Sequence, residues 1–120
     1  MTHSDKARPF PDPLDTDALV AKVAELRRLM IEVAHRTGGA YLAQALSGID
    51  LLAAMAYRFA RGDGSCPDHP DRDRLLLSPG HYALALYAVL ADVGYFERDL
   101  LGKFKEDGTP RELVNTRGTF

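Results

Sequence analysis

Apolar residues recur at three- and four-residue spacing between residues 19 and 33, and charged residues occupy the intervening positions. This period matches the turn of an α-helix and predicts an amphipathic helix with one buried face. Asp15 or Thr16 supplies the N-cap, because a side-chain oxygen can accept a hydrogen bond from the free backbone N–H groups of the first turn. Gly38 and Gly39 predict the end of this helix, since glycine readily adopts the left-handed conformation that follows a last turn.

The stretch from residue 47 to residue 60 is apolar at nearly every position, which is typical of a helix buried on most sides. Ser47 and Asp50 have the spacing of a capping box, with Asp in place of the usual Glu, so we expect this second helix to begin at Ser47. Arg61 and Gly62 should end it. The apolar surface of such a helix has to be buried, either in a core or against another subunit.

Three consecutive leucines, residues 75–77, follow a polar loop of residues 62–74 and precede Ser78-Pro79-Gly80. A short apolar run between turn residues indicates a buried parallel strand. We expect a third helix from about residue 81 to residue 93 and a fourth, short helix from about residue 97 to residue 104. One strand and one helix are half of a βαβ unit and cannot form a sheet, so we expect the chain to be incomplete or built to join another element.

Composition places this sequence among soluble globular domains. Its 120 residues are 46% hydrophobic and 27% charged, and this length allows one domain. We expect an extended arm at residues 1–14, a folded segment at residues 15–108 and an irregular tail at residues 109–120. The net charge of -2 gives no electrostatic case for nucleic-acid binding, and no apolar run is long enough to span a bilayer. The single cysteine fits a reducing cytosol, so we expect a cytoplasmic protein.

Two short motifs have the form of metal sites. Cys66 and His69 have C-x-x-H spacing, but a zinc site usually needs a second ligand pair, which the sequence lacks. Gly62-Asp63-Gly64 has the form of a metal–diphosphate motif, but a helix precedes it where a strand is required, so we interpret it as a helix C-cap and turn. We therefore expect no metal ligands here, and a free-standing helical metal protein ranks last among the possible functions.

His81 is the strongest candidate for a functional residue. It follows the expected strand and lies in the first turn of the expected third helix. Open α/β sheets bind ligands at this edge, and the free N–H groups of a helix N-terminus favour an anion such as a phosphate. An imidazole there can donate a hydrogen bond to a phosphate or transfer a proton near neutral pH. The alternative is a histidine that bonds only to backbone, and position alone does not decide between the two.

Residues 26–104 resemble the N-terminal part of transketolase, in particular the N-terminal subunit of split transketolase-like enzymes that use thiamine diphosphate. The resemblance implies an α/β fold, in which this chain is the helix-rich N-terminal portion of a diphosphate-binding domain with an incomplete parallel sheet. Its landmarks, in matching order and spacing, are Leu46-Ser47-Gly48-Ile49-Asp50-Leu51-Leu52-Ala53-Ala54, Asp71-Arg72-Asp73-Arg74, Leu77-Ser78-Pro79-Gly80-His81, residues 85–91 and Gly94-Tyr95-Phe96.

The resemblance also implies chemistry. Thiamine diphosphate carries the reactive carbanion while a two-carbon ketol unit passes from a ketose to an aldose. By resemblance, His81 is a catalytic residue that lies beside the cofactor diphosphate and the substrate, and Ser78 and Gly80 shape the cofactor-binding turn. Tyr41 stands where the family has the substrate-contacting His of a Gly-His-Pro-Gly segment. A phenol, with a pKa near ~10, is a poor proton shuttle at neutral pH but can donate a hydrogen bond.

The family's own Gly-Asp-Gly and its partner Asn, which hold Mg²⁺ and the diphosphate, have no match in this sequence. We therefore expect a chain that is inactive alone. It would act in an oligomer with a second chain that brings the metal motif and a third element that brings the pyrimidine-binding domain. The alternative, from a different class, is a non-catalytic interaction module or a truncated fragment derived from such an N-terminal subunit.

Overall fold

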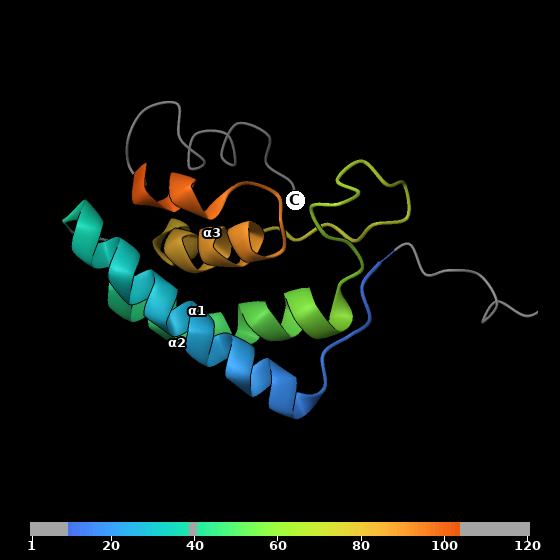
Figure 1. Ribbon diagram of the computed structural model, residues 1–120, viewed down its shortest axis with the longest axis horizontal. Coiled ribbons are helices and arrows are strands. Elements are labelled where there is room, and N and C mark those ends of the chain that lie inside the picture. Colours follow the sequence, from blue (N-terminus) through green and yellow to red (C-terminus); the bar gives the residue numbers. More distant parts are fainter. Residues whose placement is uncertain (1–9, 39–40, 104–120) are drawn as a thin grey trace, which may run out of the picture.

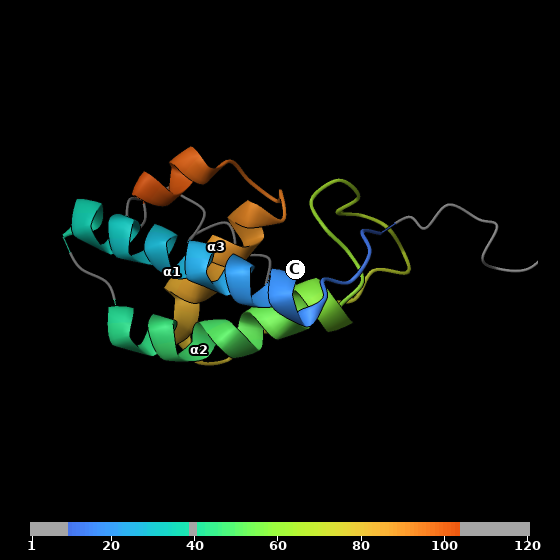
Figure 2. The ribbon, with the colours of Figure 1, turned by 60° about the horizontal axis from the view of Figure 1, so that its bottom comes forward.

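The computed structural model describes residues 10–38 and 41–103 of the chain. Helices α1 and α2 lie side by side and antiparallel, and α3 packs against both (Figures 1 and 2). The helical elements are α1 (Thr16–Thr37), α2 (Leu42–Ala54), the π-helical turn η2 (Met55–Phe59), the 3₁₀ turn η3 (Gly80–Tyr82), α3 (Ala83–Asp92) and the 3₁₀ helix η4 (Arg98–Lys103).

The first helix has the boundaries that its caps predict. The Asp15 carboxylate accepts a hydrogen bond from the backbone N–H of Ala18 at 2.8 Å, which satisfies one free donor of the first turn. At the other end Gly38 adopts φ +75°, and its N–H bonds to the carbonyl of Ala34. The predicted cap and stop of α1 are therefore confirmed. Its buried face consists of Leu26, Met30 and Val33.

The second helix begins at Leu42, so the prediction that it begins at Ser47 is wrong. The Ser47 hydroxyl donates to the carbonyl of Gln44 at 2.8 Å, within the helix, and is not an N-cap. Leucine, alanine and glutamine are strong helix formers, and Ala45 is fully buried in the core. Tertiary packing thus favours helix here over the local capping signal, and Tyr41 is the residue at the N-cap. Helical structure continues through η2 to Phe59, close to the predicted end.

Only one face of α2 is covered, whereas its composition predicts burial on most sides. Ala45, Ile49, Leu52 and Ala53 face the core. Leu51 is 67% exposed and Phe59 of η2 is 72% exposed. The difference arises because an evenly apolar sequence says nothing about which faces have neighbours, and in the described part of the chain only one side does.

Helix α3 forms the centre of the molecule. Every residue from 84 to 91 is buried, in contact with α1, α2 and η4. Leu101 of η4 closes the core on its outer side, with 2% of its surface exposed. The predicted third helix is confirmed, and the predicted fourth is a 3₁₀ helix over the part of its range that is described. No helix in residues 10–38 and 41–103 has the length and apolar character needed to cross a membrane.

The expected strand at Leu75–Leu77 is not found. The described residues contain no strand, and this segment has none of the ladder partners that define one. Leu75 and Leu77 pack against the core, while Leu76 is 67% exposed. The described architecture is therefore helical, without the parallel sheet of the α/β expectation.

The described end of the arm lies across η2. The N–H of Leu14 bonds to the carbonyl of Tyr57 at 3.0 Å, and the Arg58 guanidinium donates to the carbonyl of Leu14 at 2.8 Å. The ring of Phe10 contacts the ring of His69 edge-on, with 4.8 Å between centroids. The arm and the loop that follows Gly62 thus lie at the same end of the molecule (Figure 1). Residues 1–9 and the tail at 109–120 lie outside the described residues.

Candidate functional site

The turn before α3 is open to solvent. Pro79 has extended backbone, and the N–H of Tyr82 bonds to the carbonyl of Pro79 at 3.2 Å, which forms η3. Ser78, Gly80 and His81 are all exposed. Three of the residues that the sequence singles out therefore lie together where the chain enters its most buried helix.

Tyr41, the fourth, lies beside them. Its ring meets the imidazole of His81 edge-on, with 4.5 Å between the centroids and 66° between the planes. Tyr41 is at the N-cap of α2 and is 60% exposed, so both rings remain accessible to solvent. The tertiary structure thus brings the two predicted catalytic residues into contact, although they are far apart in the sequence.

Gly48 explains why the turn sits at this end of α2. The ring of Tyr82 lies against the Gly48 backbone, so that a β-carbon at position 48 would stand 2.6 Å from Cδ1 of the ring. Only glycine permits this approach, because any side chain would overlap the ring. The contact holds η3 against α2, and His81, next to Tyr82 in the chain, is thereby placed near Tyr41.

The turn has the features that suit one side of a phosphate group. A β-carbon built on Gly80 would meet nothing within 4 Å, so the backbone there faces open space. The N–H groups of Tyr82 and Ala83 already bond to the carbonyls of Pro79 and Gly80, so an anion at this turn would meet the N–H groups of the residues before them, at the start of η3. His81 can add a side-chain N–H donor. A metal ion would need ligands from elsewhere, because no group of three or more His, Cys, Asp or Glu residues among those described could hold one.

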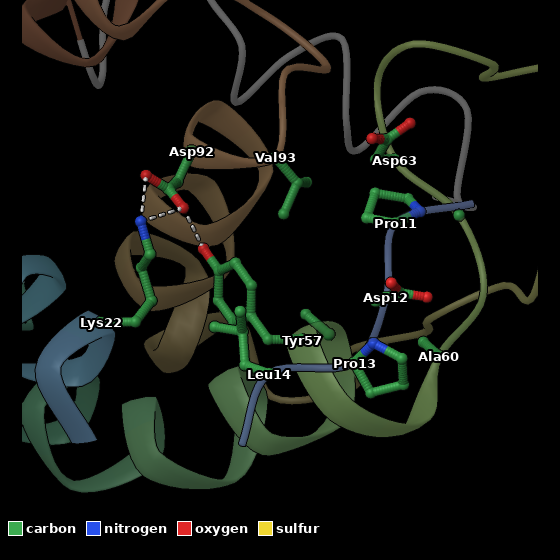
Figure 3. Close-up of a pocket in the computed structure, with 12 residues that line it drawn as sticks. Pro11, Asp12, Pro13, Leu14, Lys22, Tyr57, Ala60, Asp63, Asp92 and Val93 are labelled. Atoms are coloured by element: carbon green, nitrogen blue, oxygen red, sulfur yellow. Dashed lines mark hydrogen bonds and ion pairs between the residues drawn. The ribbon is translucent and has the colours of Figure 1, made fainter. Parts of the chain in front are cut away.

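A second polar cluster, which the sequence did not predict, joins α1, η2 and α3. The Asp92 carboxylate accepts a hydrogen bond from the Tyr57 hydroxyl at 2.5 Å and pairs with the Lys22 ammonium at 3.2 Å (Figure 3). It also pairs with Arg98, which in turn bonds to Glu25 at 2.8 Å. The Asp92 side chain is only 8% exposed. A local signal exists, since Asp92 is the only charged residue between positions 82 and 96, but nothing in the sequence names its partners.

The charges of this cluster stabilise one another. Burial by itself would raise the pKa of Asp92, but the hydrogen bonds from Tyr57, Arg98 and Lys22 outweigh it and lower that pKa. Burial and the neighbouring Asp92 carboxylate both raise the pKa of Tyr57. The pKa of Lys22 is raised, because its bonds to Asp92 and Glu25 exceed the opposing effect of burial. All of these groups are therefore held in one protonation state around neutral pH.

A cavity of about 310 Å³ adjoins this cluster, between the arm and the end of α3 (Figure 3). Pro11, Leu14, Tyr57 and Asp92 are among its lining residues. The ammonium of Lys22 is already bound by Asp92 and Glu25, so it offers no free charge to a ligand. The cluster thus braces the helices, at the opposite end of α3 from His81.

The polar loop has the turn structure expected for Gly62-Asp63-Gly64. Gly62 adopts φ +137°, and the Asp63 carboxylate accepts a hydrogen bond from the N–H of Ser65 at 3.0 Å. The N–H of Gly64 bonds to the carbonyl of Val93 at 2.8 Å, so the loop is tied to the end of α3. The expected turn is therefore present, but the cap of the preceding helical turn is Ala60, so the interpretation of Gly62 as the helix C-cap is wrong.

Comparison with known proteins points to one family. A family model described as transketolase, thiamine diphosphate binding domain, matches residues 19–108. The chain is 40% identical over 84 residues to the 6-deoxy-6-sulfo-D-fructose transketolase subunit of Clostridium sp. (strain MSTE9). This match covers 70% of this chain and 30% of the relative.

Other relatives agree. An apulose-4-phosphate transketolase subunit of Actinobacillus succinogenes is 29% identical over 96 residues, which is 79% of this chain and 35% of the relative. Transketolase of Homo sapiens is 32% identical over 92 residues, which is 76% of this chain and 15% of the relative. The chain thus spans about a third or less of the length of these relatives.

Proposed function

Because the chain belongs to the family of transketolase thiamine diphosphate-binding domains, we propose that it is part of a transketolase-like transferase. In this proposal the complete assembly moves a two-carbon ketol unit between sugars or related carbonyl compounds. The observation that carries the proposal lies inside the matched segment: His81 is exposed at the start of α3 and in contact with Tyr41.

Thiamine diphosphate, when bound, would supply the carbanion chemistry of the transfer. The open backbone at Gly80, with Ser78 beside it, would let a phosphate group approach the N–H groups of the turn. His81 would donate a hydrogen bond to a phosphate oxygen or hold a proton near the substrate. Mg²⁺ prefers oxygen ligands, and these would come from residues beyond those described.

Tyr41 gives the proposed site a particular character. The family resemblance places a histidine at this position, and histidine can exchange a proton near neutral pH. The phenol of Tyr41 can instead donate a hydrogen bond, and its ring adds an apolar surface. We therefore infer that substrate use differs from that of ordinary transketolases.

Companion chains are part of the proposal. Two of the similar proteins are named as subunits, and this chain covers 30% and 35% of their lengths. A second chain would bring the metal-binding motif, and a third segment would bring the pyrimidine-binding domain. The chain would then be inactive alone and active in a cytoplasmic oligomer.

The test is co-purification with the product of the adjacent gene, followed by calorimetry with thiamine diphosphate and Mg²⁺ and by a ketol-transfer assay. We expect saturable binding and turnover in the assembly and neither in the isolated chain. Saturable binding by the isolated chain would contradict the need for companions. An assembly that binds no cofactor would contradict the proposed function itself.

One observation favours a second candidate, a non-catalytic interaction module or a truncated fragment of such a subunit. Leu42 and Ala43 are part of α2, and Tyr41 is its N-cap, where the family resemblance places a substrate-binding loop. An assembly with full ketol-transfer activity after His81→Ala would favour this candidate, because the turn would then serve no chemical step.

A further inference from the structure

The imidazole of His81 makes one ring contact and no hydrogen bond in the part of the chain that the structure describes. The ring of Tyr41 meets it edge-on, with 4.5 Å between centroids and 66° between planes. Neither imidazole nitrogen has a hydrogen-bond partner among the described residues. The backbone is placed separately, because Tyr82, the next residue, packs on Gly48. The orientation of the imidazole therefore depends on Tyr41.

The other two histidines of the described part provide a comparison. The imidazole of His69 has two contacts, since Nδ1 accepts a hydrogen bond from the N–H of Asp71 at 3.0 Å and the ring of Phe10 meets it edge-on at 4.8 Å. His35 is exposed in the last turn of α1, and among the described residues it has neither a ring contact nor a side-chain hydrogen bond. His81, with one contact, lies between these two cases.

Tyr41 contributes its ring to this contact and not its hydroxyl. It is the N-cap residue of α2, but its side chain makes no capping hydrogen bond. Within the described ranges its hydroxyl has no hydrogen-bond partner, whereas its ring meets that of His81. Edge-to-face pairs are stabilised because the positive edge of one ring faces the negative face of the other. An imidazole in such a pair has lost rotational freedom before any ligand binds.

We propose that Tyr41 is a positioning residue, whose ring holds the imidazole of His81 in one orientation beside the open turn at Gly80. This inference rests on the proposed function for the step that His81 serves, a hydrogen bond to a phosphate oxygen or a proton held near the substrate. A group that acts at a defined atom is effective when neighbouring side chains hold it in place. Tyr41 would thus affect the reaction through His81 and would itself exchange no proton.

The first experiment measures NMR order parameters of the imidazole C–H groups in the purified 120-residue chain. We expect a high value for His69, a low value for His35 and a value for His81 well above that of His35. Tyr41→Leu should lower the value for His81 toward that of His35. Tyr41→Phe should restore it, because phenylalanine keeps the ring and removes only the hydroxyl.

Phe59→Leu is the matched control for the loss of a ring. It also replaces an exposed aromatic side chain by leucine, since Phe59 is 72% exposed in η2, and η2 lies at the opposite end of α2 from Tyr41. The order parameter of His81 should not change in this variant. His69 and His35 should keep their values in all three variants.

The second experiment measures kcat of the assembly that contains these variants. Tyr41→Leu should lower kcat about threefold or more, which is the loss expected when one aromatic pair is removed. Tyr41→Phe should restore kcat. In a His81→Ala background Tyr41→Leu should have little further effect, because Tyr41 acts through the imidazole.

Three results would overturn the proposal: an order parameter of His81 that Tyr41→Leu leaves unchanged, equal losses of kcat for Tyr41→Leu and Tyr41→Phe, or additive losses for Tyr41→Leu and His81→Ala. The NMR experiment needs neither cofactor nor companion chain, so it separates this proposal from the proposed function. Loss of order with leucine and its recovery with phenylalanine, in a chain whose assembly transfers no ketol unit, would support the positioning by Tyr41 and contradict the function.

Discussion

The aromatic ring of Tyr82 lies against the backbone of Gly48 so closely that Cδ1 would be 2.6 Å from a β-carbon at that position. Two segments that are distant in the sequence, the middle of α2 and the turn before α3, are thereby held together. The position of His81 follows from this contact, because it is the residue before Tyr82 and its ring meets Tyr41 at the N-cap of the same helix. The geometry of the candidate site therefore depends on a glycine that acts on it through Tyr82.

Gly48→Ala should destabilise the chain, although alanine is the better helix former by about 1 kcal/mol. The added methyl group must displace the ring of Tyr82, and overpacking of this kind costs about 1–3 kcal/mol. We expect a net loss of about 1 kcal/mol in the free energy of unfolding, measured by urea denaturation. In a Tyr82→Ala background the same change should stabilise the chain, because the ring is gone. Equal effects in both backgrounds would show that Gly48 does not accommodate the ring.

Asp92→Asn should lower the free energy of unfolding by about 3 kcal/mol, because it leaves two cations beside a buried position without their carboxylate. Glu25→Gln is the matched control. Glu25 also pairs with Lys22 and Arg98, but its side chain is 47% exposed, and exposed pairs contribute less than about 1 kcal/mol. Chemical denaturation of both variants tests this difference. Similar losses would indicate that burial of Asp92 does not determine the strength of the cluster.

Stability should decline on both sides of neutral pH. The folded chain lowers the pKa of Asp92, so the contribution of Asp92 is complete above its unfolded pKa of about 4 and is lost as pH falls through the folded value. The pKa values of Lys22 and Tyr57 are raised in the folded chain, so these two groups make stability depend on pH on the alkaline side. Their contributions are present below about pH 10 and are lost as pH rises through the folded values.

Urea denaturation across the pH range tests this dependence. Asp92→Asn should show a smaller decline at acid pH than the unmodified chain, because the group that must be protonated is absent. A decline of the same size in the variant would assign the acid sensitivity to other carboxylates, of which Glu25 and Asp73 also have lowered pKa values.

His81→Ala should lower turnover of the assembled enzyme at least about tenfold, as loss of a positioned acid–base group does. The fold should be unaffected, because His81 is exposed. His35 is the control: it is exposed in the last turn of α1, and His35→Ala should leave turnover unchanged. Steady-state kinetics of the two assemblies decide the matter, and an unchanged rate for His81→Ala would remove this residue from the site.

Tyr41→His should not by itself produce ordinary ketol transfer. The imidazole would stand at the N-cap of α2, followed at once by the helical residues Leu42 and Ala43, whereas the family resemblance implies a Pro and a Gly there. A ketol-transfer assay with common sugar phosphates tests the variant in the assembly. Recovery of activity would show that the side chain at position 41, and not the backbone around it, sets substrate use.

Several elements could be predicted because their signals are local. The start of α1 follows from the Asp15 carboxylate and its end from Gly38, each of which acts within one helical turn. The period of α1 and the apolar run of α3 likewise predict helices without knowledge of their neighbours. The wrong prediction for the start of α2 also has a local cause. Ser47 and Asp50 have the spacing of a capping box, but they lie inside a helix that core packing extends back to Leu42.

The sequence by itself determined that these segments are helical, where α1 begins and ends, and which residues are worth testing, because backbone propensity, side-chain period and capping act over a few neighbouring positions. Tertiary structure alone decided that the ring of Tyr41 contacts that of His81 and that Asp92 binds both Lys22 and Tyr57. It also decided which apolar residues of α2, such as Leu51, remain exposed. Such pairings depend on how helices pack in three dimensions, and the same local pattern is compatible with many packings. The wrong prediction of a strand at Leu75–Leu77 has the same origin, since a strand is defined by its neighbour and not by its own residues, and residues 10–38 and 41–103 supply no neighbouring strand.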